Sequence, residues 1–162
     1  MAITIRQFQD ADLPGMMEIW NGVVDEGAAF PQTEPLRTRE EARAFFTGQS
    51  FTGAALDGET VLGLYILHPN NIGRCGHLCN ASFAVGAQAR GKRIGEQLVR
   101  HCMEKGRELG FRVLQFNAVV CTNASAIHLY EKLGFVRLGT VPGGFLMKDG
   151  SYEDIVLFYH TL

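Results

Sequence analysis

The stretch that most constrains the fold is HLCNASFAVGAQARGKRIGEQL, from His77 to Leu98. Residues 77–85 are largely apolar, with aromatic and β-branched residues toward the end, which predicts a buried strand. Residues 86–91 break this pattern with two glycines and predict a loop. A helix follows, because apolar residues recur at helical spacing from Arg93 onward, at Ile94, Leu98, Cys102 and Leu109.

The junction between this strand and this helix carries the first chemical signal. The first N–H groups of a helix lack helical partners and lie at the positive end of the helix dipole, so they favour a phosphate. Gly91 lets the backbone approach a ligand closely, and Arg90, Lys92 and Arg93 add three cations. The sequence predicts a phosphorylated ligand, in particular a diphosphate. The alternative is an ordinary strand–helix turn with a solvated basic edge.

Length and charge narrow the function classes. The chain has 162 residues, 46% hydrophobic and 20% charged, which predicts one globular domain over residues 1–162. The formal net charge of −2 does not favour nucleic acid as a partner. No apolar run reaches the roughly 18 residues of a membrane span, and MAITIRQFQD lacks the shape of a signal peptide. We expect a cytoplasmic protein.

The cysteines predict neither disulfides nor a metal site. The four residues Cys75, Cys79, Cys102 and Cys121 form no C-x-x-C pair, and reduced thiols are the default for a cytoplasmic chain. Cys75, His77 and Cys79 would share one face of a strand. No fourth ligand follows at a spacing typical of metal sites, so no metal is expected.

Pattern and turn signals predict seven strands and four helices. The strands cover 2–8, 51–56, 60–67, 77–85, 111–120, 135–141 and 155–161, with turns at Asp57-Gly58, Gly143-Gly144 and Asp149-Gly150. The helices begin after Asp10 or Asp12, after Thr38, at Arg93 and after Asn123. The order β-α-α-β-β-β-α-β-α-β-β predicts a mixed α/β (α+β) sheet with helices on its faces.

Two motifs together resemble the GCN5-related N-acetyltransferase (GNAT) superfamily. The segment NASAIHLYEKLGF, residues 123–135, fills each position of the family's C-terminal signature, and RGKRIG, residues 90–95, resembles its pyrophosphate signature. One position departs from the pattern, because Arg93 stands where the family has the first glycine of G-x-G. The resemblance covers nearly the whole chain and implies the GNAT fold, a mixed, mostly antiparallel central sheet with helices on both faces.

The resemblance implies acetyl-CoA as cosubstrate and assigns it residues. The end of the central strand, Phe83, Ala84 and Val85, would pair its backbone with the pantetheine arm. The pyrophosphate would be held by Arg90 and by the N–H groups of the loop and first helical turn, namely Gly91, Lys92, Arg93, Ile94, Gly95 and Glu96. Asn123 would contact the cosubstrate as well as cap its helix.

The resemblance also implies a mechanism in which a neutral amine attacks the thioester carbonyl directly. A strand-end N–H would stabilise the oxyanion, and Tyr130 would protonate the leaving thiolate as general acid. The alternative for Tyr130 is a core aromatic, because Ile127, Tyr130 and Leu133 share a stripe of their helix.

A narrower resemblance concerns the acceptor. N-x-G-R-C-x-H-x-C-N-A-x-F, residues 71–83, resembles the acetyltransferases that act on L-azetidine-2-carboxylate and other proline analogues. It implies that Asn80, Asn117 and Asn123 lie at the substrate, with Asn80 counted among the catalytic and substrate-binding residues. A buried amide without a partner costs on the order of 1–3 kcal/mol, and a ligand can satisfy it. A backbone partner is the alternative.

The remaining predictions concern the acceptor loop and the function class. Glu26, beside GAAFPQ, would hold or deprotonate the substrate amine, or it is a solvated loop carboxylate. The acceptor is expected to be a small-molecule amine, foremost a cyclic amino acid. A peptide N-terminus, a polyamine, an antibiotic, or a CoA-binding module without turnover remain open. Dimers are common in the superfamily, so a homodimer is also open.

Overall fold

The computed structural model describes residues 2–162, and their strands form one seven-stranded sheet of order β1-β2-β3-β4-β5-β7-β6. The strands are β1 (Ile3–Gln7), β2 (Phe51–Asp57), β3 (Thr60–Pro69), β4 (Leu78–Val85), β5 (Val113–Val120), β6 (Val136–Leu146) and β7 (Tyr152–Thr161). The α-helices are α1 (Leu13–Glu26), α2 (Arg39–Thr47), α3 (Ile94–Glu108) and α4 (Ala124–Lys132). The expected order of elements is confirmed, as is the mixed, mostly antiparallel sheet.

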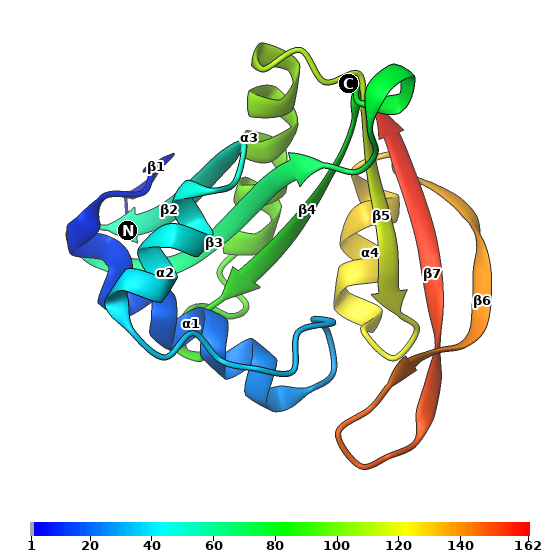
Figure 1. Cartoon of the computed structure of the whole chain (residues 1–162), viewed down its shortest axis with the longest axis horizontal. Helices are drawn as coiled ribbons and strands as arrows, with labels where there is room; N and C mark the ends of the chain where they lie inside the picture. Colours follow the sequence, from blue (N-terminus) through cyan, green and yellow to red (C-terminus); the bar gives the residue numbers. More distant parts are fainter. Residues whose placement is uncertain (1) are drawn as a thin grey trace.

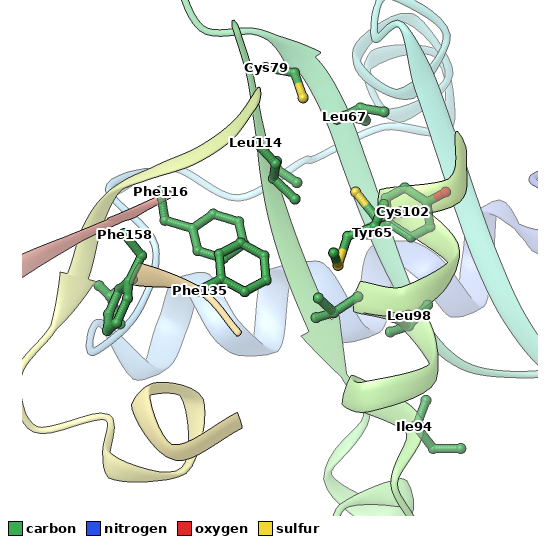
Figure 2. Packing of buried hydrophobic residues seen from close by; sticks show 14 of the residues in the cluster. Tyr65, Leu67, Cys79, Ile94, Leu98, Cys102, Leu114, Phe116, Phe135 and Phe158 are labelled. Carbon is green, nitrogen blue, oxygen red and sulfur yellow. The ribbon is translucent and has the colours of Figure 1, made fainter. Parts of the chain in front are cut away.

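Helices cover both faces of the sheet, and each face has its own core (Figure 1). On one face, α1 and α2 bury Trp20 and Phe46 against Leu64 and Ile66. On the other face, α3 and α4 cover a core that is drawn in Figure 2 and includes Tyr65, Leu67, Leu98, Leu114, Phe116, Phe135 and Phe158. The strands alternate sides with a period of two, so β3 supplies both cores.

The sheet divides between β4 and β5. These strands run parallel but pair at two positions, Leu78 with Val113 and Cys79 with Leu114, and then diverge (Figure 1). The Asn80 side chain accepts a hydrogen bond from the Ala81 N–H at 2.7 Å, directly after the last pair. This amide oxygen satisfies a backbone donor at the place where pairing to β5 ends. The divergence opens a split that begins near Asn80.

Two local predictions need correction. Gly143 and Gly144 do not form a turn: they lie inside β6, in a register irregularity between Val141 and Phe145, and the chain turns at Asp149-Gly150 instead. A bulge accommodates extra residues within a paired strand, so a glycine pair does not by itself mark a turn. Asp12 precedes α1 but does not cap it. Its carboxylate instead accepts from the Gln9 N–H at 2.8 Å and pairs with Arg6 at 2.7 Å.

The loop between α1 and α2 is held in place from several sides. Asn21 exchanges two hydrogen bonds with the backbone of Leu36, at 2.8 and 2.9 Å, and the Phe30 ring lies 4.4 Å from that of Trp20. From the β6–β7 hairpin, Lys148 donates to the Asp25 carbonyl at 2.9 Å. The loop therefore forms a fixed wall below the split in the sheet. Within residues 2–162, no helix is long and apolar enough to cross a membrane.

Candidate active site

A cleft of about 840 Å³ occupies the split. Its walls come from the end of β4, the first turn of α3, the inner face of α4 and the end of α1. The predicted residues that line it are Glu26, Phe83, Ala84, Val85, Arg90, Gly91, Arg93, Ile94, Gly95, Glu96, Asn123 and Tyr130. The fold thus brings most of the predicted site into one cavity, from segments up to about a hundred positions apart.

The start of α3 has the geometry of an anion site. The helix begins at Ile94, so the N–H groups of its first turn have no helical acceptor and lie at the cleft wall. Gly91 adopts φ +79°, and nothing lies within 4 Å of the position a Cβ would take. A phosphate can therefore approach this backbone from open space.

Arg93 takes an unusual conformation as the N-cap of α3. Its φ is +60°, the only positive φ of a non-glycine residue within residues 2–162. The left-handed region favours glycine, which explains why the family pattern has glycine here. In this chain the strained position is occupied by an arginine, and Arg93 lines the cleft.

The cations of the loop do not all face the same space. Arg90 pairs with Glu26 at 2.9 Å, and both side chains are about half exposed. An exposed ion pair contributes at most about 1 kcal/mol, so a phosphate can displace Glu26 from Arg90. Lys92 does not line the cleft. It lines a second cavity of about 760 Å³ on the other side of the loop, against α1.

Glu96 on α3 forms ion pairs with both helices that line the cleft, α3 and α4. Its carboxylate lies 3.2 Å from both Lys132 on α4 and Arg100 on α3. These hydrogen bonds, first Lys132 and then Arg100, lower the pKa of Glu96. The carboxylate is thus ionised and neutralised beside the anion site, so it repels a phosphate little.

Tyr130 points from α4 into the cleft region beside an aromatic cluster. Its ring centroid lies 4.4 Å from Phe116 and 5.5 Å from Phe135. Burial raises the pKa of Tyr130 well above that of a free phenol. The hydroxyl therefore stays protonated at neutral pH, and no residue of 2–162 forms a hydrogen bond with it. Both the aromatic packing and the cleft position that the sequence suggested are present.

Asn123 caps α4 and lines the cleft. Its Oδ1 accepts from the Ala126 N–H at 3.3 Å, and its side chain lines the cavity. Asn80 and Asn117 lie outside the cavity lining. Asn117 is exposed rather than buried, because β5 has already diverged from β4 at that level.

Several residues of the cleft wall were not singled out from the sequence. On α4 these are Ser125, His128 and Leu129, which lie on one helical face with Lys132, a residue of the family's C-terminal signature. This helical spacing was the sequence signal that could have placed these residues at the cleft wall. The rest of the wall consists of small or apolar side chains that carry no chemical signal on their own, namely Val23, Ala28, Ala29, Ala89, Val99, Thr122 and Ala126. Within residues 2–162, no three His, Cys, Asp or Glu residues are placed to hold a metal ion.

Comparison with known sequences identifies the family. The sequence profile described as the acetyltransferase (GNAT) family matches residues 16–135. The N-acetyltransferase aca1 of Schizosaccharomyces pombe is 36% identical over 110 residues, which are 66% of this chain and 53% of that protein. The chain thus spans about half the length of that relative. An L-methionine sulfoximine/L-methionine sulfone acetyltransferase of Pseudomonas paraeruginosa is 30% identical, over 100% of this chain and 96% of its own.

Solved structures agree with this comparison. A GCN5-related N-acetyltransferase from Kribbella flavida superposes with a TM-score of 0.90 at 35% identity, covering 99% of this chain and 98% of its own. A phosphinothricin acetyltransferase from Sinorhizobium meliloti, solved in complex with acetyl-CoA, has a TM-score of 0.88 at 26% identity, covering 100% and 89%. The fold described above is therefore found in structures that carry acetyl-CoA.

Proposed function

The chain belongs to the GNAT acetyltransferase family; from this premise we propose that it is an acetyl-CoA-dependent N-acetyltransferase that acetylates the amine of a small amino acid. Several relatives whose names specify a substrate act on amino-acid analogues, namely methionine sulfoximine, methionine sulfone and phosphinothricin, whereas a neighbour from Brucella melitensis is named a ribosomal-protein-alanine N-acetyltransferase. These analogues carry primary α-amines, so they support the amino-acid class with a primary amine as acceptor. A cyclic amino acid such as azetidine-2-carboxylate is the candidate that the resemblance around Asn80 favours.

The observation that carries the proposal is the cleft itself. It joins an anion site at the start of α3 to the divergence of β4 and β5, and Glu26 lies at its edge. The N–H groups of Ile94, Gly95 and Glu96 would hold the pyrophosphate, with Arg90 and Arg93 adding charge. Phe83, Ala84 and Val85 would pair with the pantetheine arm through their backbone, and Asn123 would contact the cosubstrate from the opposite wall.

The chemistry proposed is direct transfer. The amine nitrogen attacks the thioester carbonyl carbon, the carbon–sulfur bond breaks, and the amine proton leaves to a base. Glu26, once released from Arg90, is the carboxylate placed to hold or deprotonate the amine. Tyr130 would donate to the leaving sulfur. Its raised pKa makes it a weaker acid than free phenol, so hydrogen-bond donation precedes any transfer of its proton.

Thiol release from acetyl-CoA across a panel of amines tests the proposal. The panel contains azetidine-2-carboxylate, hydroxyprolines, phosphinothricin, methionine sulfoximine, common amino acids, polyamines and short peptides. Turnover on the amino acids or their analogues supports it. Turnover confined to polyamines or peptides contradicts the amino-acid class, and acetyl-CoA binding without turnover on any amine contradicts the direct transfer.

We propose further that the protein is a homodimer. Strand β6 is an edge strand that leaves Val136, Leu138, Val141 and Leu146 exposed, and Tyr152 of β7 lies beside them. An edge strand with exposed apolar residues favours pairing with another chain. A second copy of the same strand would cover this edge.

A further inference from the structure

Two aromatic rings meet across the split between the diverging strands. Phe83 of β4 lines the cleft, and its ring packs edge to face on that of Phe116 of β5, with the centroids 5.9 Å apart. The backbones of the two strands pair only at Leu78 and Cys79 of β4. The rings therefore bridge the split at a level where backbone pairing has already ended.

This ring contact lies at the inner end of the cleft. Within residues 2–162, the lining residues of β4 are those from Phe83 to Val85, at the end of the strand, and β5 contributes none. Tyr130 lines the cleft from α4, and its ring packs on Phe116 at 4.4 Å. Phe116, only 4% exposed, thus contacts both rings that face the cleft. We call the three rings of Phe83, Phe116 and Tyr130 the aromatic end wall.

The Phe83 ring is held from a second side as well. Its centroid lies 5.8 Å from that of Tyr65 on β3, which is completely buried and whose hydroxyl lies 2.8 Å from Nδ1 of His101. Close-packed side chains resist displacement, because any shift must be passed on to their neighbours. The aromatic end wall is therefore a rigid limit to what the cleft accepts at this end.

We propose that Phe83 determines which acyl group is transferred, because the aromatic end wall leaves room for an acetyl group and not for a longer chain. This rests on the proposed function, in which the pantetheine arm pairs with the β4 backbone and Tyr130 donates to the sulfur. An arm that starts at the first turn of α3 and passes Val85 and Ala84 brings its acyl group to Phe83. The carbon–nitrogen bond forms and the carbon–sulfur bond breaks whatever the chain length, so the wall acts through fit alone.

The expected selectivity follows from the value of one methylene group. In an apolar pocket, one methylene changes kcat/KM by about 10–200-fold. We therefore expect kcat/KM for acetyl-CoA to exceed that for propionyl-CoA at least about tenfold, with butyryl-CoA used still less. Removing the Phe83 ring opens space at the end wall and should reduce this difference.

The test measures kcat/KM for the three thioesters, with the best amine of the panel, in Phe83→Ala, Phe83→Leu and Phe51→Ala. Phe51 on β2 is the matched control, because its ring lies 5.9 Å from the same Tyr65 but does not line the cleft. Phe83→Ala should raise the propionyl-to-acetyl ratio about tenfold, and its activity with acetyl-CoA should fall severalfold because the acetyl group loses a contact. Phe83→Leu should lie between the two and keeps more of the packing should the alanine variant unfold. Phe51→Ala should leave the ratio unchanged.

The outcomes separate this proposal from the function beneath it. If the wild type turns over acetyl-CoA but neither Phe83 variant changes the ratio, the role of Phe83 is wrong and the function stands. An equal change in Phe51→Ala would also overturn the role, since it would report disturbed packing of Tyr65. If no amine is acylated, the proposed function fails, and titration calorimetry still tests the wall. Equal dissociation constants of the three thioesters for the wild type would then contradict it.

Discussion

At the scale of single residues, Arg93 has a strained backbone conformation and a positively charged side chain that we expect to contact a phosphate. Its φ of +60° is unfavourable for a side chain with a Cβ, by about 1–2 kcal/mol for an L-residue in this region. Retaining arginine there suggests a use for the guanidinium at the mouth of the cleft. Two substitutions separate the backbone strain from the contribution of the guanidinium to binding. Glycine removes both the strain and the charge, whereas alanine removes only the charge.

We therefore expect Arg93→Gly to unfold at a higher denaturant concentration than Arg93→Ala. Both variants should bind acetyl-CoA more weakly than the wild type, and about equally, because both lack the cation. Chemical denaturation and calorimetric titration with acetyl-CoA measure the two effects. Wild-type affinity in both variants would mean that the side chain points away from the phosphates.

Tyr130 is the residue on which the acid assignment depends. Tyr130→Phe should lower kcat about a hundredfold and leave the dissociation constant of acetyl-CoA nearly unchanged. Stability should also change little, because the lost hydroxyl has no partner within residues 2–162. Tyr152→Phe is the matched control, since Tyr152 is 67% exposed on β7. Unchanged turnover in Tyr130→Phe would leave Tyr130 as a packing residue of the aromatic cluster.

At the scale of elements, the first turn of α3 must leave room for the ligand. A Cβ on Gly95 would meet Leu129 at 3.7 Å and Val85 at 3.9 Å, which are ordinary contact distances, and it would lie at the cleft wall. Gly95→Ala should therefore fold normally, with a melting temperature equal to or above the wild type, because alanine favours a helix.

The same substitution should weaken acetyl-CoA binding about tenfold, because the added methyl group narrows the cleft between α3 and α4. Gly22→Ala on α1 is the control, since nothing lies within 4 Å of its Cβ position and Gly22 does not line the cleft. Titration calorimetry with acetyl-CoA compares the two. Equal affinity in both variants would place the pyrophosphate away from this turn.

The packing of α3 on β3 should depend on pH. The buried Tyr65 hydroxyl lies 2.8 Å from Nδ1 of His101, and burial, aided by Lys105, lowers the pKa of His101. Glu104 and Glu108 oppose this shift. The unfolded chain then binds a proton more readily than the folded one, so the stabilisation is present above the unfolded pKa of about 6.5 and is lost as the pH falls through the lower folded pKa.

The melting temperature should accordingly fall between pH 7 and pH 5. In His101→Asn an amide oxygen replaces Nδ1 as acceptor and does not titrate, so the fall should be smaller. Scanning calorimetry at several pH values measures both curves. Parallel curves for the wild type and His101→Asn would assign the pH dependence to other groups.

At the scale of the whole molecule, the exposed edge strand β6 is the surface through which we propose that two copies pair. Leu138 on β6 is 55% exposed, in an edge strand whose other side pairs with β7. We expect the protein to sediment with twice the mass of the chain, and Leu138→Lys to shift it toward the monomer. Lys105→Ala, a change on α3 far from that edge, serves as the control. A wild-type monomer at micromolar concentration would contradict the homodimer.

The sequence by itself determined the order and type of the elements, because hydrophobic periodicity and capping residues are local. The strand–glycine–helix junction at residues 77–98 and the motif from Asn123 to Phe135 were enough to predict the fold, and the anion site at that junction stays a prediction. Gly91 and Asn123 act as their residue types suggest. The error at Gly143-Gly144 arose because a glycine pair fits a bulge as well as a turn.

The tertiary structure alone decided which side chains share a space. The Glu26–Arg90 pair joins residues 64 positions apart, and the Asn70–Asn117 pair joins residues 47 apart across an intervening strand. Pairing of β4 with β5 stops after two positions, which opens the cleft and leaves Asn117 exposed. Such contacts depend on where strands diverge in space, and a pattern that is read along the chain does not record that divergence.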